Sequence, residues 1–242
     1  MMNRVCLVTG ASRRVGRAIA LAMAEAGFDI VVHYRSSEAD AQAVAAECRD
    51  RGVDAELVRA DLTRSVDIAA MFLDVDARFE RLDALINCAA VFRRTPPEAL
   101  SEADFDSMIA TNLKAPYLCS IEAASRMRRA GGGRIVNIAD VAAERPMPNY
   151  VPYCVSKAGL LMLTRTMARA YAPDIQVNAV SPGTVLFRDD ETEAMRTRVI
   201  ARIPRGRIGT PEDVARSVVF LCTGPEHVTG TVLHVDGGRS LA

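Results

Sequence analysis

Residues 5–16 read VCLVTGASRRVG, an apolar run that passes through a glycine-containing turn into the start of a helical pattern. Gly10 ends the run and Gly16 opens the helix. The first turn of a helix leaves backbone N–H groups unpaired and carries positive partial charge, which favours a phosphate. The same arrangement also occurs simply to connect two elements. The stretch predicts a strand, a turn and a helix, with a candidate dinucleotide site at Gly10, Ser12, Arg13, Arg14, Val15 and Gly16.

Six further apolar, β-branched runs follow, and segments of helical period separate most of them. The seven runs are residues 5–10, 28–34, 54–62, 82–90, 133–140, 175–183 and 231–238, with later helices expected around 101–130, 152–171 and 211–223. Unbroken apolar strands that alternate with helices favour a parallel sheet covered on both faces. We predict an α/β fold, a Rossmann-like doubly wound seven-stranded parallel sheet. The polar segment 188–207 lacks strong periodicity and is expected to be a mobile flap.

The composition limits the number of domains and the kinds of partner. The chain has 242 residues, 50% of them hydrophobic, which is enough for a sizeable core and ordinary for one α/β domain. We expect a single domain over residues 1–242. The 30 basic and 30 acidic side chains balance, so no long-range field favours nucleic acid or an anionic membrane. The expected partners are a small-molecule substrate and sister subunits.

The six cysteines form no C-x-x-C pair and no cluster with metal-ligand spacing. They are expected to be reduced, largely buried thiols, with no metal site. The N-terminus shows no signal-peptide pattern, and no apolar run approaches the roughly 18 to 20 residues that span a bilayer. We therefore expect a cytoplasmic protein that does not enter the membrane.

Ligands of doubly wound sheets bind at the carboxyl ends of the strands, so the residues after each run are the candidates for the site. The second run ends in Tyr34, Arg35 and Ser36, where a reader of a free ribose 2′-hydroxyl would be acidic. An arginine beside hydroxyl donors suits an adenosine 2′-phosphate. We predict NADPH as the cofactor, with its 2′-phosphate held by Arg35 and by Arg13 or Arg14. Either of these two arginines could instead be a solvated surface charge.

The ends of the third and fourth runs complete the predicted cofactor site. Asp61 could accept a hydrogen bond from the adenine amino group, or it could simply cap the next helix. The small side chains after the fourth run would let a ribose approach closely. These positions add Asp61, Leu62, Ala89 and Ala90 to the cofactor residues.

Tyr153 and Lys157 are four residues apart in a helical pattern and therefore share one face. A free tyrosine has a pKa near ~10. A neighbouring ammonium favours the phenolate and brings the tyrosine closer to proton exchange at neutral pH. A Y-x-x-x-K pair is common on helices, and it gains weight here because it follows the fifth run of a dinucleotide fold.

Taken in order, TG-x5-G, the strand end at Asn87, Asn112, NIAD, Y-x-x-x-K, VNAVSPG and VDGG resemble the short-chain dehydrogenase/reductase family over the whole chain. The resemblance implies that Tyr153 is the general acid and that Lys157 binds the nicotinamide ribose and lowers the tyrosine pKa. It also implies contacts with the cofactor from Asn87 and from Pro182, Gly183 and Thr184.

The resemblance further implies that Asn112 carries a water relay. The sequence supports this independently, because Pro116 lacks the N–H that would bond the carbonyl of residue 112 in an α-helix. The carbonyl would then be free for water. The alternative is a plain proline kink.

Two positions depart from the family pattern. Arg14 replaces the usual middle glycine, and Asp140 replaces the usual serine thirteen residues before the tyrosine. A serine hydroxyl donates to a ketone oxygen, whereas an ionised aspartate can only accept and would repel that oxygen. A carboxylate could instead accept from, or pass a proton to, a ring nitrogen, as reduction of a C=N bond requires.

These two departures resemble the pteridine reductase branch of the family, as do HYRSS and the terminus VDGGRSLA. In that branch an aromatic side chain stacks the pterin against nicotinamide, and Phe92 is the candidate, although an aromatic after a strand is more often core. The resemblance implies a substrate site of Phe92, Asp140 and Tyr153 and a catalytic set of Asp140, Tyr153, Lys157 and Asn112.

The first expectation is therefore an NADPH-dependent reductase of a dihydropterin or dihydrofolate. The alternative keeps the fold and cofactor but reduces a ketone such as a 3-oxoacyl thioester, with Asp140 protonated or turned away. A third possibility is a non-catalytic NADPH sensor, which would not need Tyr153 and Lys157. Family members are commonly homotetramers, and the resemblance implies the same assembly here.

Overall fold

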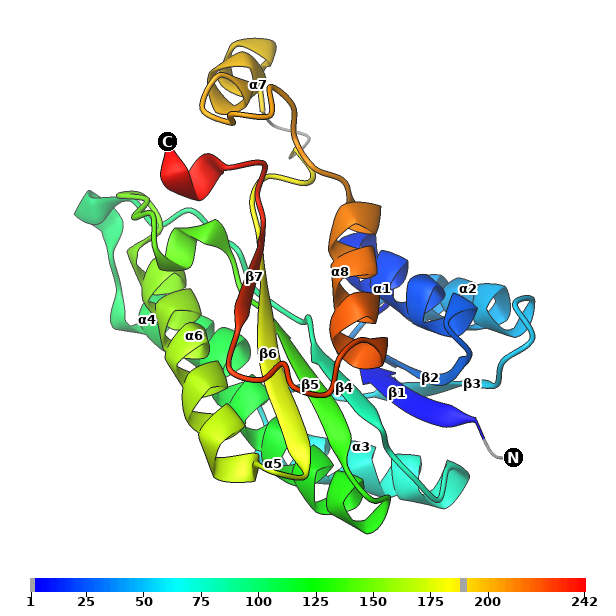
Figure 1. The fold of residues 1–242 in the computed structure, drawn as a ribbon. Coiled ribbons are helices and arrows are strands. Elements are labelled where there is room, and N and C mark those ends of the chain that lie inside the picture. Colours follow the sequence, from blue (N-terminus) through cyan, green and yellow to red (C-terminus); the bar gives the residue numbers. More distant parts are fainter. Residues whose placement is uncertain (1–2, 188–190) are drawn as a thin grey trace.

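The computed structural model describes residues 3–187 and 191–242. Its centre is one seven-stranded, fully parallel sheet in the order β3-β2-β1-β4-β5-β6-β7 (Figure 1). The strands are β1 (Arg4–Val8), β2 (Phe28–Tyr34), β3 (Ala55–Arg59), β4 (Ala84–Asn87), β5 (Gly133–Ile138), β6 (Ile175–Pro182) and β7 (Val232–Val235). The sequence order reverses between β1 and β4, which makes this edge the crevice where such sheets bind ligands. The predicted doubly wound fold is confirmed.

Helices cover both faces of the sheet, with α1, α2 and α8 on one side and α3, α5 and α6 on the other (Figure 1). The helices are α1 (Arg14–Glu25), α2 (Glu38–Arg49), α3 (Ser65–Arg78), α4 (Glu102–Ile109), α5 (Ala115–Arg129), α6 (Val151–Tyr171), α7 (Glu193–Ile200) and α8 (Pro211–Thr223). No helix in the described part of the chain is long and apolar enough to cross a membrane.

The strand β1 shows why its sequence is apolar throughout. Cys6 and Val8 pack into the core under α1, α2 and α8. Val5 and Leu7 point the other way, into the core under α3, α5 and α6. Successive side chains of a strand alternate between the faces of a sheet, so a strand covered on both sides needs an apolar residue at every position.

The helix expected over residues 101–130 is interrupted. It is divided into α4, a π-helical turn over Ala110–Lys114, and α5. Pro116 lies in the first turn of α5, where its missing N–H removes one bond of the α-helical ladder. A local change to i→i+5 bonding is the usual way to accommodate such a break, and it often occurs beside functional sites.

The polar segment 188–207, expected to be a mobile flap, contains a helix, and its mobility stays a prediction. Residues 188–190 lie outside the described part of the chain, but Glu193–Ile200 form α7. The side chain of Thr192 accepts a hydrogen bond from the backbone N–H of Met195 and caps this helix. The helix buries none of its own residues, so it lacks the apolar periodicity by which a helix is recognised in sequence.

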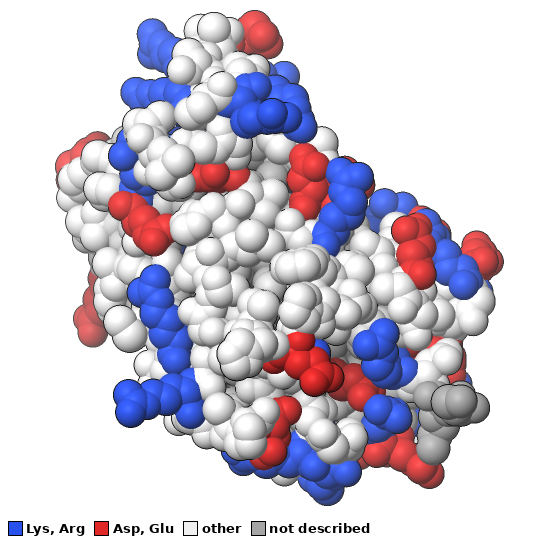
Figure 2. Space-filling model, in the orientation of Figure 1, with Lys and Arg blue, Asp and Glu red and all other residues white. Residues whose placement is uncertain are grey.

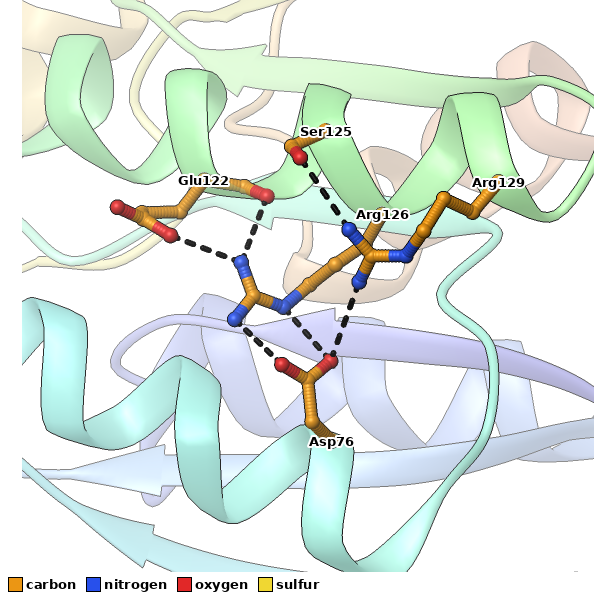
Figure 3. Close-up of polar contacts among 5 residues, drawn as sticks. All are labelled: Asp76, Glu122, Ser125, Arg126 and Arg129. Atoms are coloured by element: carbon orange, nitrogen blue, oxygen red, sulfur yellow. Dashed lines mark hydrogen bonds and ion pairs between the residues drawn. The ribbon is translucent and has the colours of Figure 1, made fainter.

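An ionic cluster centred on the buried side chain of Arg126 ties α3 to α5 (Figure 3). Arg126 is 8% exposed, and its guanidinium donates to both carboxylate oxygens of Asp76 at 2.8 and 2.6 Å. It also donates to Glu122 at 2.8 Å and lies over the ring of Phe72. A bidentate arginine–carboxylate pair fixes both distance and orientation between the two helices.

The surface charges are mixed, as the balanced composition predicts. Figure 2 shows basic and acidic side chains side by side over most of one face, around a largely uncharged middle over β7 and α8. All six cysteines are free, in agreement with the expected reduced thiols. In the described ranges 3–187 and 191–242, no group of histidine, cysteine or acidic side chains could hold a metal ion.

Candidate active site

A cavity of about 710 Å³ opens at the carboxyl ends of the strands and gathers most of the predicted site residues. Its lining includes the predicted cofactor residues Gly10, Ser12, Arg13, Arg14, Val15, Gly16, Tyr34, Arg35, Ser36, Asp61, Leu62, Ala89, Ala90, Pro182, Gly183 and Thr184, and the predicted catalytic or substrate residues Phe92, Asp140, Tyr153 and Lys157. Two predicted residues, Asn87 and Asn112, are not part of this lining.

The turn between β1 and α1 is packed so closely that two of its positions admit only glycine. A Cβ on Gly16 would stand 2.1 Å from the carbonyl oxygen of Gly10. Gly10 has φ of +66°, and a Cβ there would stand 2.9 Å from the Cα of Ala89. The backbone therefore comes close to the start of α1, whose first N–H groups have no helical acceptors. This is the geometry of a cradle for a pyrophosphate.

Arg14 has φ of +53°, a left-handed conformation that side-chain-bearing residues rarely adopt. Arg13 pairs with Asp40 on the surface, whereas neither Arg14 nor Arg35 forms an ion pair with any residue of the described ranges. Both unpaired arginines line the cavity with Ser36. Of the two arginines left open by the sequence, the structure thus favours Arg14 as the partner of Arg35. Two guanidinium groups without an ion pair in the described ranges, beside a hydroxyl, fit the 2′-phosphate of NADP(H).

Asp61 lines the cavity, and its predicted contact with the adenine stays a prediction, whereas its alternative role as a helix cap is wrong. The helix α3 begins at Ser65 with Arg64 in the capping position. The carboxylate of Asp61 instead accepts from the backbone N–H of Thr63 at 3.0 Å and from its hydroxyl at 2.7 Å. These bonds hold the pKa of Asp61 below its usual range and fix its side chain at the wall of the cavity.

The catalytic residues of α6 meet Asp140 at the end of β5. The hydroxyl of Tyr153 donates to one carboxylate oxygen of Asp140 at 2.8 Å, and the other oxygen accepts from the backbone N–H of Ala142 at 2.8 Å. Lys157 donates from Nζ to the carbonyl of Ile138 at 2.7 Å. Its Nζ lies 5.8 Å from the centre of the Tyr153 ring. Both side chains of α6 are largely buried, although each contributes to the lining of the cavity.

The electrostatics of this group differ from the expectation. Burial, followed by the charge of Asp140 and the hydrogen bond to it, raises the pKa of Tyr153 well above its usual value. The predicted lowering of the Tyr153 pKa by Lys157 is therefore not seen in this structure. Burial also raises the pKa of Asp140 and lowers that of Lys157. Burial is the main cause of the raised Tyr153 pKa, and the contact with Asp140 raises it further, because a carboxylate disfavours the charged phenolate.

Asn112 is a connecting residue in this structure. Its side-chain amide accepts from the backbone N–H of Val91 at 2.8 Å and donates to the carbonyl of the same residue at 3.0 Å. It also lies 3.1 Å from the hydroxyl oxygen of Ser156. The side chain thereby joins the π-helical turn to the loop after β4 and to α6. The predicted water relay would use the backbone carbonyl of Asn112, and it stays a prediction.

Asn87, predicted from the strand end to contact the cofactor, is 3% exposed and points into the protein. Its amide donates to the side-chain oxygen of Asn137 at 2.8 Å, and Asn137 donates in turn to Thr164 at 2.9 Å. This buried chain links β4, β5 and α6. Position at a strand end could not distinguish a side chain that faces the cavity from one that faces a helix.

Phe92 belongs to the cavity wall and not to the core. Its ring is 45% exposed, stacks on Tyr150 with centroids 4.7 Å apart, and meets the ring of Tyr153 edge-on at 4.7 Å. The sequence reasoning missed Tyr150, His33 and Arg239, which also line the cavity. Tyr150 lies three residues before Tyr153, so a search for aromatic residues next to the catalytic pair would have found it.

Comparisons with known proteins agree with this geometry. A family model described as enoyl-(acyl carrier protein) reductase matches residues 10–240. The 3-oxoacyl-[acyl-carrier-protein] reductase FabG of Staphylococcus aureus is 35% identical over 241 residues, which is 98% of each chain. The structure of gluconate 5-dehydrogenase from Burkholderia cenocepacia, in complex with NADP and tartrate, is similar with a TM-score of 0.92 and 31% identity, over 99% of this chain and 96% of that one. Acetoin dehydrogenase from Enterobacter cloacae gives a TM-score of 0.91 and 34% identity over 100% and 98% of the two chains.

The glycine cradle, the paired tyrosine and lysine, and these relatives define an oxidoreductase that uses a nicotinamide dinucleotide. The chain belongs to the short-chain dehydrogenase/reductase family. The matches do not indicate the pteridine reductase branch. The names of the curated relatives favour the alternative prediction, a 3-oxoacyl or other carbonyl reductase.

Proposed function

We propose that the protein is an NADPH-dependent reductase of a conjugated C=N bond in a planar heterocycle of the dihydropterin or dihydrofolate type. The observation that carries this proposal is the contact between Tyr153 and Asp140. The two groups present one hydroxyl proton and a buried carboxyl side by side at the cavity wall. An ionised carboxyl there repels a carbonyl oxygen and accepts from a ring N–H.

NADPH supplies a hydride to the substrate carbon when it is bound. Tyr153, held protonated by its raised pKa, delivers a proton to the substrate nitrogen, and Asp140 shares that proton through its 2.8 Å bond. Lys157 lies behind the pair, where its positive charge favours the anionic form of the carboxyl. Arg14 and Arg35 hold the 2′-phosphate and thereby select NADPH over NADH.

The aromatic wall supports a flat substrate. Phe92 and Tyr150 stack with an interplanar angle of 2° and form a continuous apolar surface next to the Tyr153 ring. A conjugated ring gains offset or edge contacts with such a surface beyond its simple burial. A flexible acyl chain gains only the burial, because it has no π-system to align.

A second candidate is the reduction of a 3-oxoacyl thioester or another carbonyl, and the names of the relatives favour it. The raised pKa of Asp140 offers a route to this chemistry. A neutral carboxyl group has one O–H and could donate it to a carbonyl oxygen, as a serine hydroxyl does. The two candidates therefore differ in the protonation state of one side chain.

Turnover of dihydrobiopterin, dihydrofolate and acetoacetyl-CoA with NADPH tests the proposal, in the wild type and in Asp140→Ser. We expect the wild type to reduce a pterin substrate at least about tenfold faster than the thioester, and Asp140→Ser to reverse the preference. Fast reduction of the thioester, no turnover of either pterin and no loss in Asp140→Ser would overturn the proposal in favour of the second candidate.

The assembly is proposed from exposed apolar side chains. Tyr117, Ile121, Val155 and Met162 are between 40% and 59% exposed on α5 and α6, and Phe220 is 50% exposed on α8. Apolar surface of this kind is typical of subunit contacts. We propose that the protein forms a homotetramer in the cytoplasm. Light scattering should then give a molar mass of about four times that of one chain.

A further inference from the structure

His33 lies near the end of β2, directly beneath the turn that connects β1 to α1. The ring is 2% exposed and touches the cofactor cavity from below. The mechanism proposed above assigns it no task. A buried histidine beside a cofactor turn therefore needs a separate physical account.

Both ring nitrogens of His33 are engaged by backbone groups of the cavity wall. Nδ1 accepts from the N–H of Gly10 at 2.9 Å, and Nε2 lies 3.2 Å from the carbonyl oxygen of Ala60. The two bonds require the neutral tautomer with its proton on Nε2. Burial, which lowers the pKa of His33 to about 4, keeps the ring in this neutral form.

The partners of His33 belong to the two halves of the predicted adenosine site. Gly10 opens the phosphate turn, and Ala60 precedes Asp61 at the predicted adenine wall. The backbone carbonyl of His33 also accepts from the N–H of Ala11 at 2.9 Å. Two consecutive N–H groups of the turn are thus held by one residue and are not available to a phosphate.

The other sides of the Gly10 peptide are held by close packing. Its Cα faces Ala89, and its carbonyl oxygen faces Gly16 at a distance where no Cβ fits. The nitrogen is the one side that depends on a side chain, and that side chain is His33. Without this acceptor, no side-chain hydrogen bond from the described residues holds the Gly10 peptide in its conformation with φ of +66°. A rotation of this peptide would change the direction in which the first N–H groups of α1 point.

We propose that His33 is a positioning residue for the dinucleotide: its neutral ring bridges the phosphate turn to the adenine wall and sets the orientation of the Gly10 peptide. The inference rests on the proposed cofactor site and not on the choice of substrate. It predicts that the acceptor at Nδ1 matters more for cofactor affinity than the donor at Nε2, because only the acceptor bonds the phosphate turn.

Two substitutions separate the two bonds. His33→Asn places an amide oxygen near the position of Nδ1 and keeps the acceptor for Gly10, whereas His33→Gln reaches the position of Nε2 and keeps the donor to Ala60. His33→Leu removes both bonds. The matched control is His227→Gln, the same change at an exposed histidine outside the cavity lining.

Two measurements are made on each variant whose melting transition shows a folded protein. The first is the Kd of NADPH by nucleotide fluorescence, together with kcat and KM for NADPH. The second is hydrogen exchange of the peptide that contains residues 9–16, measured without cofactor. We expect His33→Asn to keep the Kd within about threefold of the wild type and His33→Gln to raise it about tenfold or more. KM for NADPH follows the Kd, kcat at saturating NADPH stays within about twofold, and exchange is faster only in His33→Gln and His33→Leu.

Equal Kd values for His33→Asn and His33→Gln, or unchanged exchange in a folded His33→Leu, would overturn the role of His33. A fall in kcat with unchanged KM would do the same, since it would point to the chemical step. A wild type that binds no NADPH would refute the proposed function instead. The exchange measurement would then still decide whether His33 holds the turn, because it needs no cofactor.

Discussion

Replacing Arg14 with glycine is predicted to stabilise the fold while weakening the cofactor site. The left-handed φ of +53° costs a side-chain-bearing residue about 1 to 2 kcal/mol, which glycine does not incur. Glycine also makes the unfolded chain more flexible, which offsets about 0.5 to 1 kcal/mol of that gain. The net gain of about 0.5 kcal/mol corresponds to a rise in Tm of about 1 to 2 °C for a chain of this size.

The same substitution removes one of the two guanidinium groups that we propose hold the 2′-phosphate. A hydrogen bond to a charged group contributes about 1.5 to 3 kcal/mol. The Kd for NADPH should therefore rise about 10- to 100-fold, while the Kd for NADH, which has no 2′-phosphate, should change less than about threefold. Arg14→Ala is the matched variant, because it loses the charge but keeps a Cβ in the left-handed conformation.

Differential scanning fluorimetry of the cofactor-free protein and fluorescence titrations with both nucleotides give the three numbers needed for each variant, one Tm and two Kd values. The expected order of Tm is Arg14→Gly above wild type and Arg14→Ala below Arg14→Gly, with the same loss of NADPH affinity in both. If Arg14→Gly bound NADPH as tightly as the wild type, Arg14 would not contact the 2′-phosphate. If Arg14→Gly melted well below the wild type, the conformation at residue 14 would not be strained.

The remaining predictions concern the acid–base pair and the ionic cluster. Tyr153→Phe should lower kcat about 100-fold or more and leave the Kd for NADPH within about threefold, and unchanged turnover would favour the non-catalytic alternative. The pKa of Asp140 is raised above its usual 3.8 in the folded state, so the native protein holds this proton more tightly than the unfolded chain. The stability of the wild type relative to Asp140→Asn should therefore be highest below about pH 3.8 and fall as the pH rises through the folded pKa, as urea unfolding at several pH values would show. Asp76→Asn leaves the buried Arg126 with Glu122 alone and should lower Tm by about 2 to 6 °C, whereas Asp40→Asn, which breaks the surface pair with Arg13, should change it by less than about 2 °C.

The sheet could be predicted from sequence because its central strands are buried on both faces and therefore consist almost entirely of apolar residues. A strand such as β1 sends alternate side chains into two apolar cores and so appears as an unbroken apolar run. The helix α8 lies at its predicted bounds, and the structure shows a capping box of Thr210 and Asp213 at its start. The helix α7 was missed because it buries none of its residues, so no periodic signal marks it.

Within the site, the sequence predicted those residue positions that depend only on short spacings along the chain. Tyr153 and Lys157 share a helix face by their separation of four, and Gly10 and Gly16 flank a turn of fixed length. Contacts between distant segments were not predictable in this way. Asn87 and Asn112 both lie near the cavity, but neither is part of its lining. Their side chains form hydrogen bonds with other elements of the protein instead.

The direction of the Tyr153 pKa is the most instructive of these differences. Spacing placed an ammonium next to the phenol, but the structure places a buried carboxyl in direct contact with it and the ammonium farther away. Burial by itself raises the pKa of a phenol, and the nearby carboxyl raises it further, so both effects oppose the lowering expected from the ammonium. A pattern of residues in one helix could not show this, because the decisive residue comes from the end of a strand thirteen positions earlier.

The carboxyl group of Asp140 reconciles two facts about this chain. Its relatives are named for carbonyl reduction, whereas its site is the one for which we propose a nitrogen heterocycle. The fold, the cofactor turn and the tyrosine–lysine pair are shared chemistry that transfers hydride and proton to any suitably polarised double bond. The choice of electrophile depends on what stands beside the tyrosine. A neutral Asp140 donates one hydrogen bond and favours oxygen, and an ionised Asp140 accepts and favours a ring N–H. Burial raises the Asp140 pKa, whereas the hydrogen bonds from Ala142 and Tyr153, followed by the charges of Lys157 and Arg239, lower it. Our proposal therefore depends on which of these opposing effects prevails at this position.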